Sequence, residues 1–151
     1  MLDDIDKKLL AALQGNAHYT AQDLSERLNL SASQAGRRRQ KLEADGYISG
    51  YHAHLEASRI GLTVQAFVQV QLRSHGPEEA RGFSRLAEIR PEIISVWTLT
   101  GDYDYLLRIY CSDLSSLNQL IHNVILPHPA VARVQSQIVM DQLKQDAPLP
   151  T

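Results

Sequence analysis

A corner of only two residues, Asn29 and Leu30, separates two helical patterns near the start of the chain. Thr20 can cap the helix before the corner, and Ser31 followed by Gln34 forms a capping box for the helix after it. Helices joined by so short a link must turn sharply and pack against each other. The segment therefore predicts a helix-turn-helix.

A third helical pattern precedes this pair. Asp3 can cap a helix that ends near Gly15 and has Ile5, Leu9 and Leu13 on one face. Since the two later helices also have an apolar side, the three together can enclose one small core.

The pattern changes after Gly46, which ends the third helix. Residues 47–50 favour short extended segments suited to a wing, so residues 1–50 are predicted to be a winged helix-turn-helix domain. Residues 51–62 are predicted to be a linker strand, with the domain boundary marked by Gly61.

The second half of the chain alternates apolar and polar residues, as half-buried strands do. Strands are predicted over residues 64–72, 94–98, 105–111 and 131–143. Helices are predicted after Pro77 and Asp113. The order strand, helix, strand, strand, helix, strand is that of a ferredoxin-like domain. The fold class is therefore α+β, with this domain at 63–143 and a loose tail at 144–151.

Two helices leave one face of a four-stranded sheet uncovered. Such a face is usually buried against another copy of the chain. Val64, Val68 and Ile109 are among the residues predicted to be buried in this way. The pattern thus predicts at least a homodimer.

The basic residues of the first half are concentrated on the third helix, although the whole chain has a net charge of -2. A polar and basic helix in this position fits the major groove of double-stranded DNA, where arginine reads guanine, glutamine reads adenine and lysine meets phosphate. The predicted DNA-binding residues are Ser33, Gln34, Arg37, Arg38 and Lys41. A solvated charged face is the alternative, and the capped corner before the helix favours DNA.

Composition argues against several other classes of protein. No apolar run approaches the roughly 18 residues that span a bilayer. The acidic opening at Asp3, Asp4 and Asp6 differs from the basic start of a signal peptide, and the helix dipole accounts for it. The single cysteine, Cys111, cannot form an internal disulfide. A cytoplasmic protein is expected.

Three stretches of the chain resemble the Lrp/AsnC family of feast/famine transcription regulators. Residues 2–10 resemble its opening helix, and residues 100–107 (TGDYDYLL) resemble the most characteristic motif of its ligand domain. Its recognition helix and wing are resembled by residues 30–33, 37–38 and 42–51. The matches have the family's order and spacing. The resemblance implies amino-acid effectors and dimers, built through the ligand domains, that often form octamers or hexadecamers. The expected protein is a regulator without catalysis, and no cofactor is expected.

Arg39 departs from the family pattern, which usually has an aliphatic residue at this position. Because Arg39 falls between Ala35 and Leu42 on the inward face, it is expected to lay its methylenes over the core and send its guanidinium outward. Gly36 costs the same helix roughly 1 kcal/mol relative to alanine. It is expected to allow close approach of a backbone, either of DNA or of the neighbouring helix.

The turn that contains Asp102 and Asp104 has three interpretations. Paired carboxylates suit acid–base catalysis, and Gly-Asp suits a plain hairpin turn. The family resemblance favours a third, a site whose carboxylates and backbone N–H groups hold a small zwitterion. The predicted effector site comprises Gly101, Asp102, Tyr103 and Asp104, completed by Gln135 and Ser136 of the last strand. Asp104 is the predicted ammonium acceptor.

Two functions remain open from the sequence. The leading one is a sequence-specific DNA-binding regulator whose DNA binding or assembly is modulated by a small effector, an amino acid or a close relative. The alternative is a ferredoxin-like amino-acid-binding module or enzyme whose N-terminal helices serve protein contacts. Arg37 and Arg38 after a capped corner favour the first. No metal site is expected, since His52 and His54 have no third ligand nearby in sequence.

Overall fold

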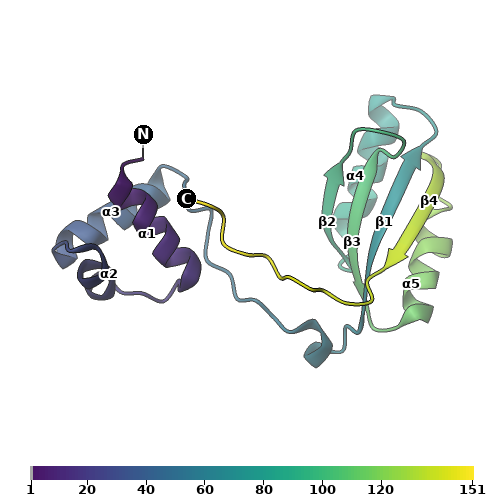
Figure 1. The fold of residues 1–151 in the computed structure, drawn as a ribbon. Coiled ribbons are helices and arrows are strands. Elements are labelled where there is room, and N and C mark those ends of the chain that lie inside the picture. Colours follow the sequence, from purple (N-terminus) through teal and green to yellow (C-terminus); the bar gives the residue numbers. More distant parts are fainter. Residues whose placement is uncertain (1) are drawn as a thin grey trace. The chain divides into compact units, whose positions relative to one another are not determined.

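The computed structural model describes residues 2–151, and the chain divides into two compact units (Figure 1). The first unit comprises Met1–His54 together with Leu143–Thr151, and the second is Leu55–Gln142. No helix within residues 2–151 is long and apolar enough to cross a membrane.

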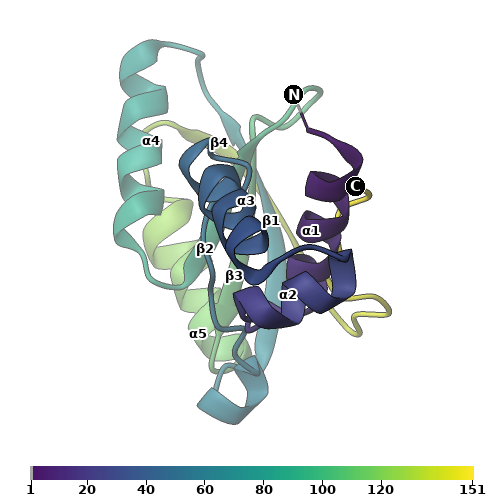
Figure 2. The same ribbon diagram turned by 90° about the vertical axis from the view of Figure 1, so that its left-hand side faces the viewer.

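Three helices form the first unit: α1 (Asp4–Gly15), α2 (Ala21–Leu28) and α3 (Ala32–Ala44). Each begins with a capping box in which the N-cap side chain and the third helical residue satisfy each other's backbone N–H groups. Asn29 ends α2 with a φ of 54°, which turns the chain toward α3. The helices pack together (Figure 2) around a core of Leu9, Leu13, Leu24, Ala35 and Leu42.

The linker strand expected over residues 51–62 is absent, so that prediction is wrong. Residues 51–56 have no regular structure, and a short 3-10 helix, η1 (Ala57–Ile60), follows them. A strand needs a partner for its backbone groups, and no other segment of residues 2–151 pairs with this one. The predicted wing at residues 47–50 likewise contains no strand.

The second unit has the predicted ferredoxin-like order. Its strands are β1 (Val64–Leu72), β2 (Ile93–Thr98), β3 (Tyr105–Cys111) and β4 (Val131–Ile138), in the spatial order β2-β3-β1-β4 and antiparallel throughout. Helices α4 (Pro77–Ile89) and α5 (Leu114–Leu120), the latter continued by the π turn η2 (Ile121–Ile125), lie behind this sheet in Figure 1. The last strand ends at Ile138, earlier than expected.

The helices cover the sheet face on which Val68 and Ile109 lie. Both residues are fully buried within a single chain, in one cluster with Phe83 of α4, and Val64 packs against that cluster. The expectation that these three residues belong to the uncovered face is therefore wrong. Alternation shows which residues share a face, but it does not show which face the helices cover.

The uncovered face carries the other residues of each strand. Trp97 pairs with Leu106, and Phe67 pairs with Arg108, so each pair projects from this face. Trp97 keeps 45% of its surface exposed. Large aromatic and aliphatic groups therefore remain on this side of the sheet.

The tail, expected to be loose, is attached to the first unit. The side-chain amide of Gln14 donates from Nε2 to the carbonyl oxygen of Leu149 at 3.0 Å, and the Leu149 N–H donates to its Oε1 at 2.6 Å. One amide thus meets both backbone groups of one tail residue.

Gly36 faces the neighbouring helix. A Cβ built on Gly36 would lie 3.6 Å from the Cβ of Ala21 in α2, an ordinary van der Waals contact. We predict that Gly36→Ala raises the free energy of unfolding by about 0.5–1 kcal/mol, since alanine favours the helix and fits the space. Gly46→Ala is the control: Gly46 has a φ of +77°, so this variant should lose stability. Urea unfolding measures both. A loss of stability in Gly36→Ala would mean that α2 cannot accept the methyl group.

Candidate DNA-binding helix and effector site

Helix α3 has one buried side and one exposed side. Ala35 and Leu42 are buried in the core of the first unit. Because successive residues of a helix are rotated by about 100°, Ser33, Arg37 and Lys41 lie on the opposite side. All three are exposed. The centre of the exposed face is therefore polar and basic, as the sequence predicted.

Gln34 also lies on the exposed part of α3, but its side chain has a partner. Its Oε1 accepts from the backbone N–H of Ser31 at 3.0 Å, and the N–H of Gln34 donates to the Ser31 hydroxyl at 3.2 Å. The hydroxyl groups of Ser31 and Ser33 lie 3.1 Å apart. The carbonyl end of Gln34 thus caps the helix, and its amide nitrogen lies at the same exposed end of α3.

Arg38 stands at one edge of the exposed face and is bound to α1. Its guanidinium donates to Asp3 at 2.7 Å and to Asp6 at 2.6 Å. The backbone N–H of Asp6 and the guanidinium of Arg38 lower the pKa of Asp3, and the two carboxylates raise the pKa of Arg38. The acidic cluster at the start of α1 thus holds α3 as well as capping its own helix, a role that the helix dipole alone did not predict.

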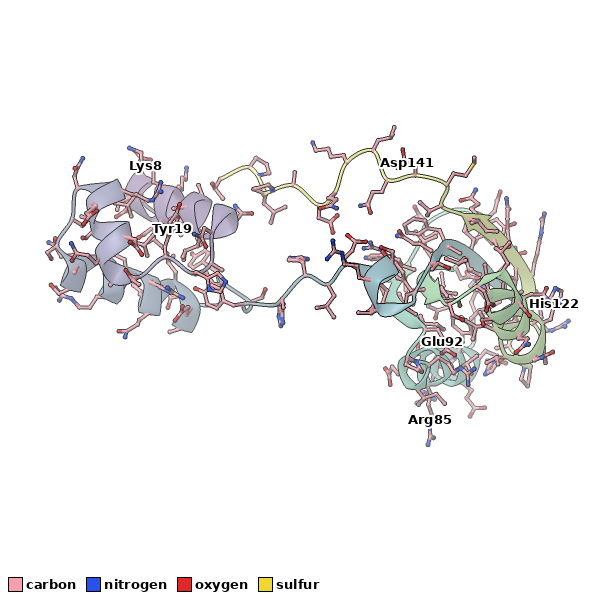
Figure 3. The ribbon with its side chains drawn as sticks, turned by 90° about the horizontal axis from the view of Figure 1, so that it is seen from below. Lys8, Tyr19, Arg85, Glu92, His122 and Asp141 are labelled. Carbon is pink, nitrogen blue, oxygen red and sulfur yellow. The ribbon has the colours of Figure 1, made fainter. Side chains whose placement is uncertain are left out.

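Arg39 stands at the other edge of α3. The expectation that its guanidinium points outward is wrong, because it donates to the backbone oxygen of Tyr19 at 2.9 Å and to Glu43 at 3.0 Å. Figure 3 shows Tyr19 among the helices of the first unit. Arg38 and Arg39 are thus only partly exposed. Arg37 and Lys41 are the basic residues of α3 that lie fully on its exposed face.

The β2–β3 hairpin contains Gly101, whose φ of +110° is a conformation that favours glycine. Asp104, at its end, is fixed by three bonds to the end of β1 and its loop. Its carboxylate accepts from the N–H of Leu72 at 2.7 Å and lies 2.8 Å from Nε2 of His75, and its own N–H donates to the Val70 carbonyl at 2.9 Å. Asp104 is therefore first a structural anchor of the turn.

Tyr103 extends over the uncovered face of the sheet to β4. Its hydroxyl donates to Oε1 of Gln135 at 2.7 Å, and the guanidinium of Arg133 lies 5.8 Å from its ring centre. The structure thus brings Tyr103 together with Gln135, while Asp102 lies exposed in the same turn.

Ser136 does not join this group. It is the register partner of Val68, whose side chain is buried under the helices, so Ser136 projects from the helix-covered face. Consecutive residues of a strand point to opposite faces, and Gln135 and Ser136 therefore cannot both meet Tyr103.

Sequence reasoning missed His75 and Arg133. The position of Arg133, two residues before Gln135 on the same strand, indicates that it shares the face of Gln135. His75 lies in the loop after β1, and no periodicity links it to Asp104, 29 residues away.

Comparisons with known proteins cover nearly the whole chain. Residues 2–49 match the family of winged helix-turn-helix DNA-binding domains, and residues 65–149 match the Lrp/AsnC ligand binding domain. The DNA-binding transcriptional activator DecR of Escherichia coli is 34% identical over 150 residues, which cover 99% of each chain. The glutamate uptake regulatory protein of Zymomonas mobilis is 34% identical over 99% of this chain and 90% of its own.

Solved structures of transcriptional regulators are also similar to nearly the whole chain. A transcriptional regulator of Neisseria meningitidis, solved as a complex with L-Met, is similar with a TM-score of 0.94 and 34% identity, over 99% of this chain and 97% of its own. An AsnC family transcriptional regulator of Agrobacterium tumefaciens has a TM-score of 0.90 and 30% identity, with the same coverage.

The Arg38 ion pairs predict a pH-dependent stability. Because the pKa of Asp3 is lowered in the folded protein, its carboxylate stabilises the fold fully above the ordinary carboxyl pKa. This stabilisation is lost as the pH falls through the lowered pKa of Asp3. We predict that Arg38→Gln lowers stability near neutral pH and has a smaller effect once the pH falls well below about 4. Thermal unfolding across this range measures it, with Arg85→Gln as the control, since Arg85 points into solvent (Figure 3). An equal loss at every pH would show that the carboxylates do not hold Arg38.

Proposed function

Because the chain belongs to the Lrp/AsnC family of DNA-binding transcriptional regulators, we propose that it binds specific operator sites through α3 and that an amino acid or a close relative modulates this binding. The observation that carries the proposal is the exposed face of α3, whose basic centre lies opposite the buried Ala35 and Leu42. The protein acts by binding, without a catalytic step, and it works in the cytoplasm, where the chromosome is.

We assign different tasks to the residues of α3. Arg37 has the exposure and position to reach a guanine, and Lys41 to reach a phosphate. Ser33 and the amide nitrogen of Gln34 lie at the N-terminal end of α3, and this is the end that approaches the bases. Arg38 is bound to two carboxylates, so its task is to hold α3 against α1 rather than to read a base.

The effector site is proposed at the hairpin and the neighbouring part of β4. The regulator solved with L-Met supports an effector of this class, since it aligns with almost the whole chain. Asp104 already accepts bonds at both oxygens, so the exposed carboxylate of Asp102 becomes the candidate acceptor for the effector's ammonium group. The proposed site contains Gly101, Asp102, Tyr103, Asp104 and Gln135, without Ser136.

We also propose that the protein assembles through the uncovered sheet face, as a homodimer or a larger closed assembly such as an octamer. Trp97, Leu106 and Phe67 on this face supply the apolar surface that an interface needs. A two-fold dimer carries two recognition helices, so the operator should be pseudo-palindromic, with half-sites about 34–36 Å apart.

Arg37 and Lys41 should respond differently to replacement. We predict that Arg37→Ala weakens binding to a specific operator by about 1–3 kcal/mol and relaxes the preference for one base pair, since a paired contact to guanine is lost. Lys41→Ala should weaken binding to all sequences similarly and reduce the salt slope by about one. Titrations at several salt concentrations measure both effects, with Arg85→Ala as the control. If the two variants and the control bind alike, α3 is not the DNA-binding element.

The proposed effector site predicts that a substitution in the hairpin abolishes amino-acid binding, whereas a substitution elsewhere does not. In a thermal-shift screen of the twenty amino acids, at least one should stabilise the parent, by about 2.7 kcal/mol at a hundred times its Kd. Asp102→Ala should abolish this shift, and Asp141→Ala, which removes a different exposed carboxylate, should retain it. An amino acid that stabilises Asp102→Ala as strongly as the parent would refute this site.

A further inference from the structure

An arginine without an acidic partner lies in the first half of β4. Arg133 is exposed, and no carboxylate within residues 2–151 forms an ion pair with it. Its register partner on β1 is Gln71, and the register partner of Gln135 is Gln69. Because partners across two strands share one face, this corner of the uncovered face combines a guanidinium with side-chain amides. A guanidinium only donates hydrogen bonds, so this corner favours an anionic group.

Tyr103 of the hairpin holds two donors of this corner in place. Its hydroxyl donates to Oε1 of Gln135 at 2.7 Å, which leaves the amide nitrogen of Gln135 as the end that can meet a ligand. The guanidinium carbon of Arg133 lies 5.8 Å from the centre of the same ring, within the range of a cation–π contact. Arg133 and Gln135 are two positions apart on one strand, so their side chains lie on the same face.

The register of the sheet places this corner close to the end of the hairpin. The N–H of Asp104 donates to the carbonyl of Val70, and the carboxylate of Asp104 accepts from the N–H of Leu72. These two residues of β1 flank Gln71, the register partner of Arg133. Asp104 and Arg133 therefore lie on either side of β1, with their backbones roughly 10 Å apart, which is two strand spacings. A small ligand and a long arginine side chain together span this distance.

A second copy of the chain packed on the same face would not supply an acid for Arg133. Among the described strand residues that project from the uncovered face, the side chains are amides, arginines, aromatic and aliphatic groups and a serine, and none is acidic. A two-fold interface presents the same patch from both copies. Such a copy therefore adds further donors without a carboxylate, whereas an amino-acid effector carries one.

We propose that Arg133, together with the amide nitrogen of Gln135, binds the carboxylate of the amino-acid effector, while Asp102 accepts its ammonium group. The proposal rests on the proposed function, since it names the residue that recognises one end of the effector proposed there. A guanidinium binds a carboxylate through two parallel N–H donors, so both charged ends of the zwitterion meet a side chain of opposite charge. The effector class is then an amino acid with both groups free, and compounds that lack either charge bind weakly.

The test compares an amino acid with its own carboxamide, which keeps the ammonium group and loses the charge of the carboxylate. The amino acid that gives the parent the largest thermal shift is titrated into the full chain by calorimetry, and its carboxamide likewise. The parent should bind the acid at least about tenfold more tightly, because a hydrogen bond between charged groups is lost in the amide. Arg133→Gln should lower the affinity for the acid by about tenfold or more and change that for the carboxamide by less than about threefold.

Arg85→Gln is the matched control, since it removes an arginine of α4 that points into solvent, and it should keep the preference of the parent (Figure 3). The Tm without ligand checks that each variant is folded. If Arg133→Gln weakens both ligands equally, Arg133 only supports the Tyr103 ring, and the proposal is overturned. An unchanged preference for the acid also overturns it, and a weaker dimer in sedimentation would then assign Arg133 to the interface. If no amino acid shifts the parent, the effector class of the proposed function fails, and this assignment fails with it.

Discussion

The burial of Ala35 and Leu42 in the core of the first unit is the constraint on which the proposed DNA-binding surface depends. It fixes the rotation of α3, so Arg37 and Lys41 occupy the centre of the exposed side and Arg38 and Arg39 its two edges. The edge arginines contact other parts of the unit: Arg38 binds the carboxylates of α1, and Arg39 binds Glu43 and the backbone before α2. A basic triplet that looks uniform in sequence thus has one exposed member and two that support the helix.

The same division explains how a chain with a net charge of -2 can present a basic surface. Asp3 and Asp6 neutralise Arg38, and Glu43 neutralises Arg39, so on α3 the positive charge outside these ion pairs is that of Arg37 and Lys41. The hairpin of the second unit has a similar arrangement, since Asp104 anchors the turn while Asp102 stays exposed. At both places, one charged residue fixes the element that presents another.

Local patterns in the sequence predicted most of the fold. The caps at Thr20 and Ser31, the order of strands and helices, and the rotation of α3 all follow from interactions among residues close in sequence. The ion pairs of Arg38 join residues more than thirty positions apart, and no periodicity predicts them. The prediction of a linker strand is wrong because residues 51–56 have no pairing partner within the described chain. The prediction that Ser136 belongs to the effector site is wrong because its side chain points away from that of Gln135. The outward orientation expected for Arg39 ignored acceptors that Tyr19 and Glu43 supply in three dimensions.

Everything assigned to α3 requires that this chain recognises a particular DNA sequence. Selection of genomic DNA fragments with the purified full-length protein, at a moderate salt concentration of about 0.15 M, tests it most directly, because nonspecific electrostatic binding is weak under these conditions. We expect strong enrichment of a few fragments that share one pseudo-palindromic sequence. Recovery of fragments with no common sequence, or of no DNA at all, would contradict it.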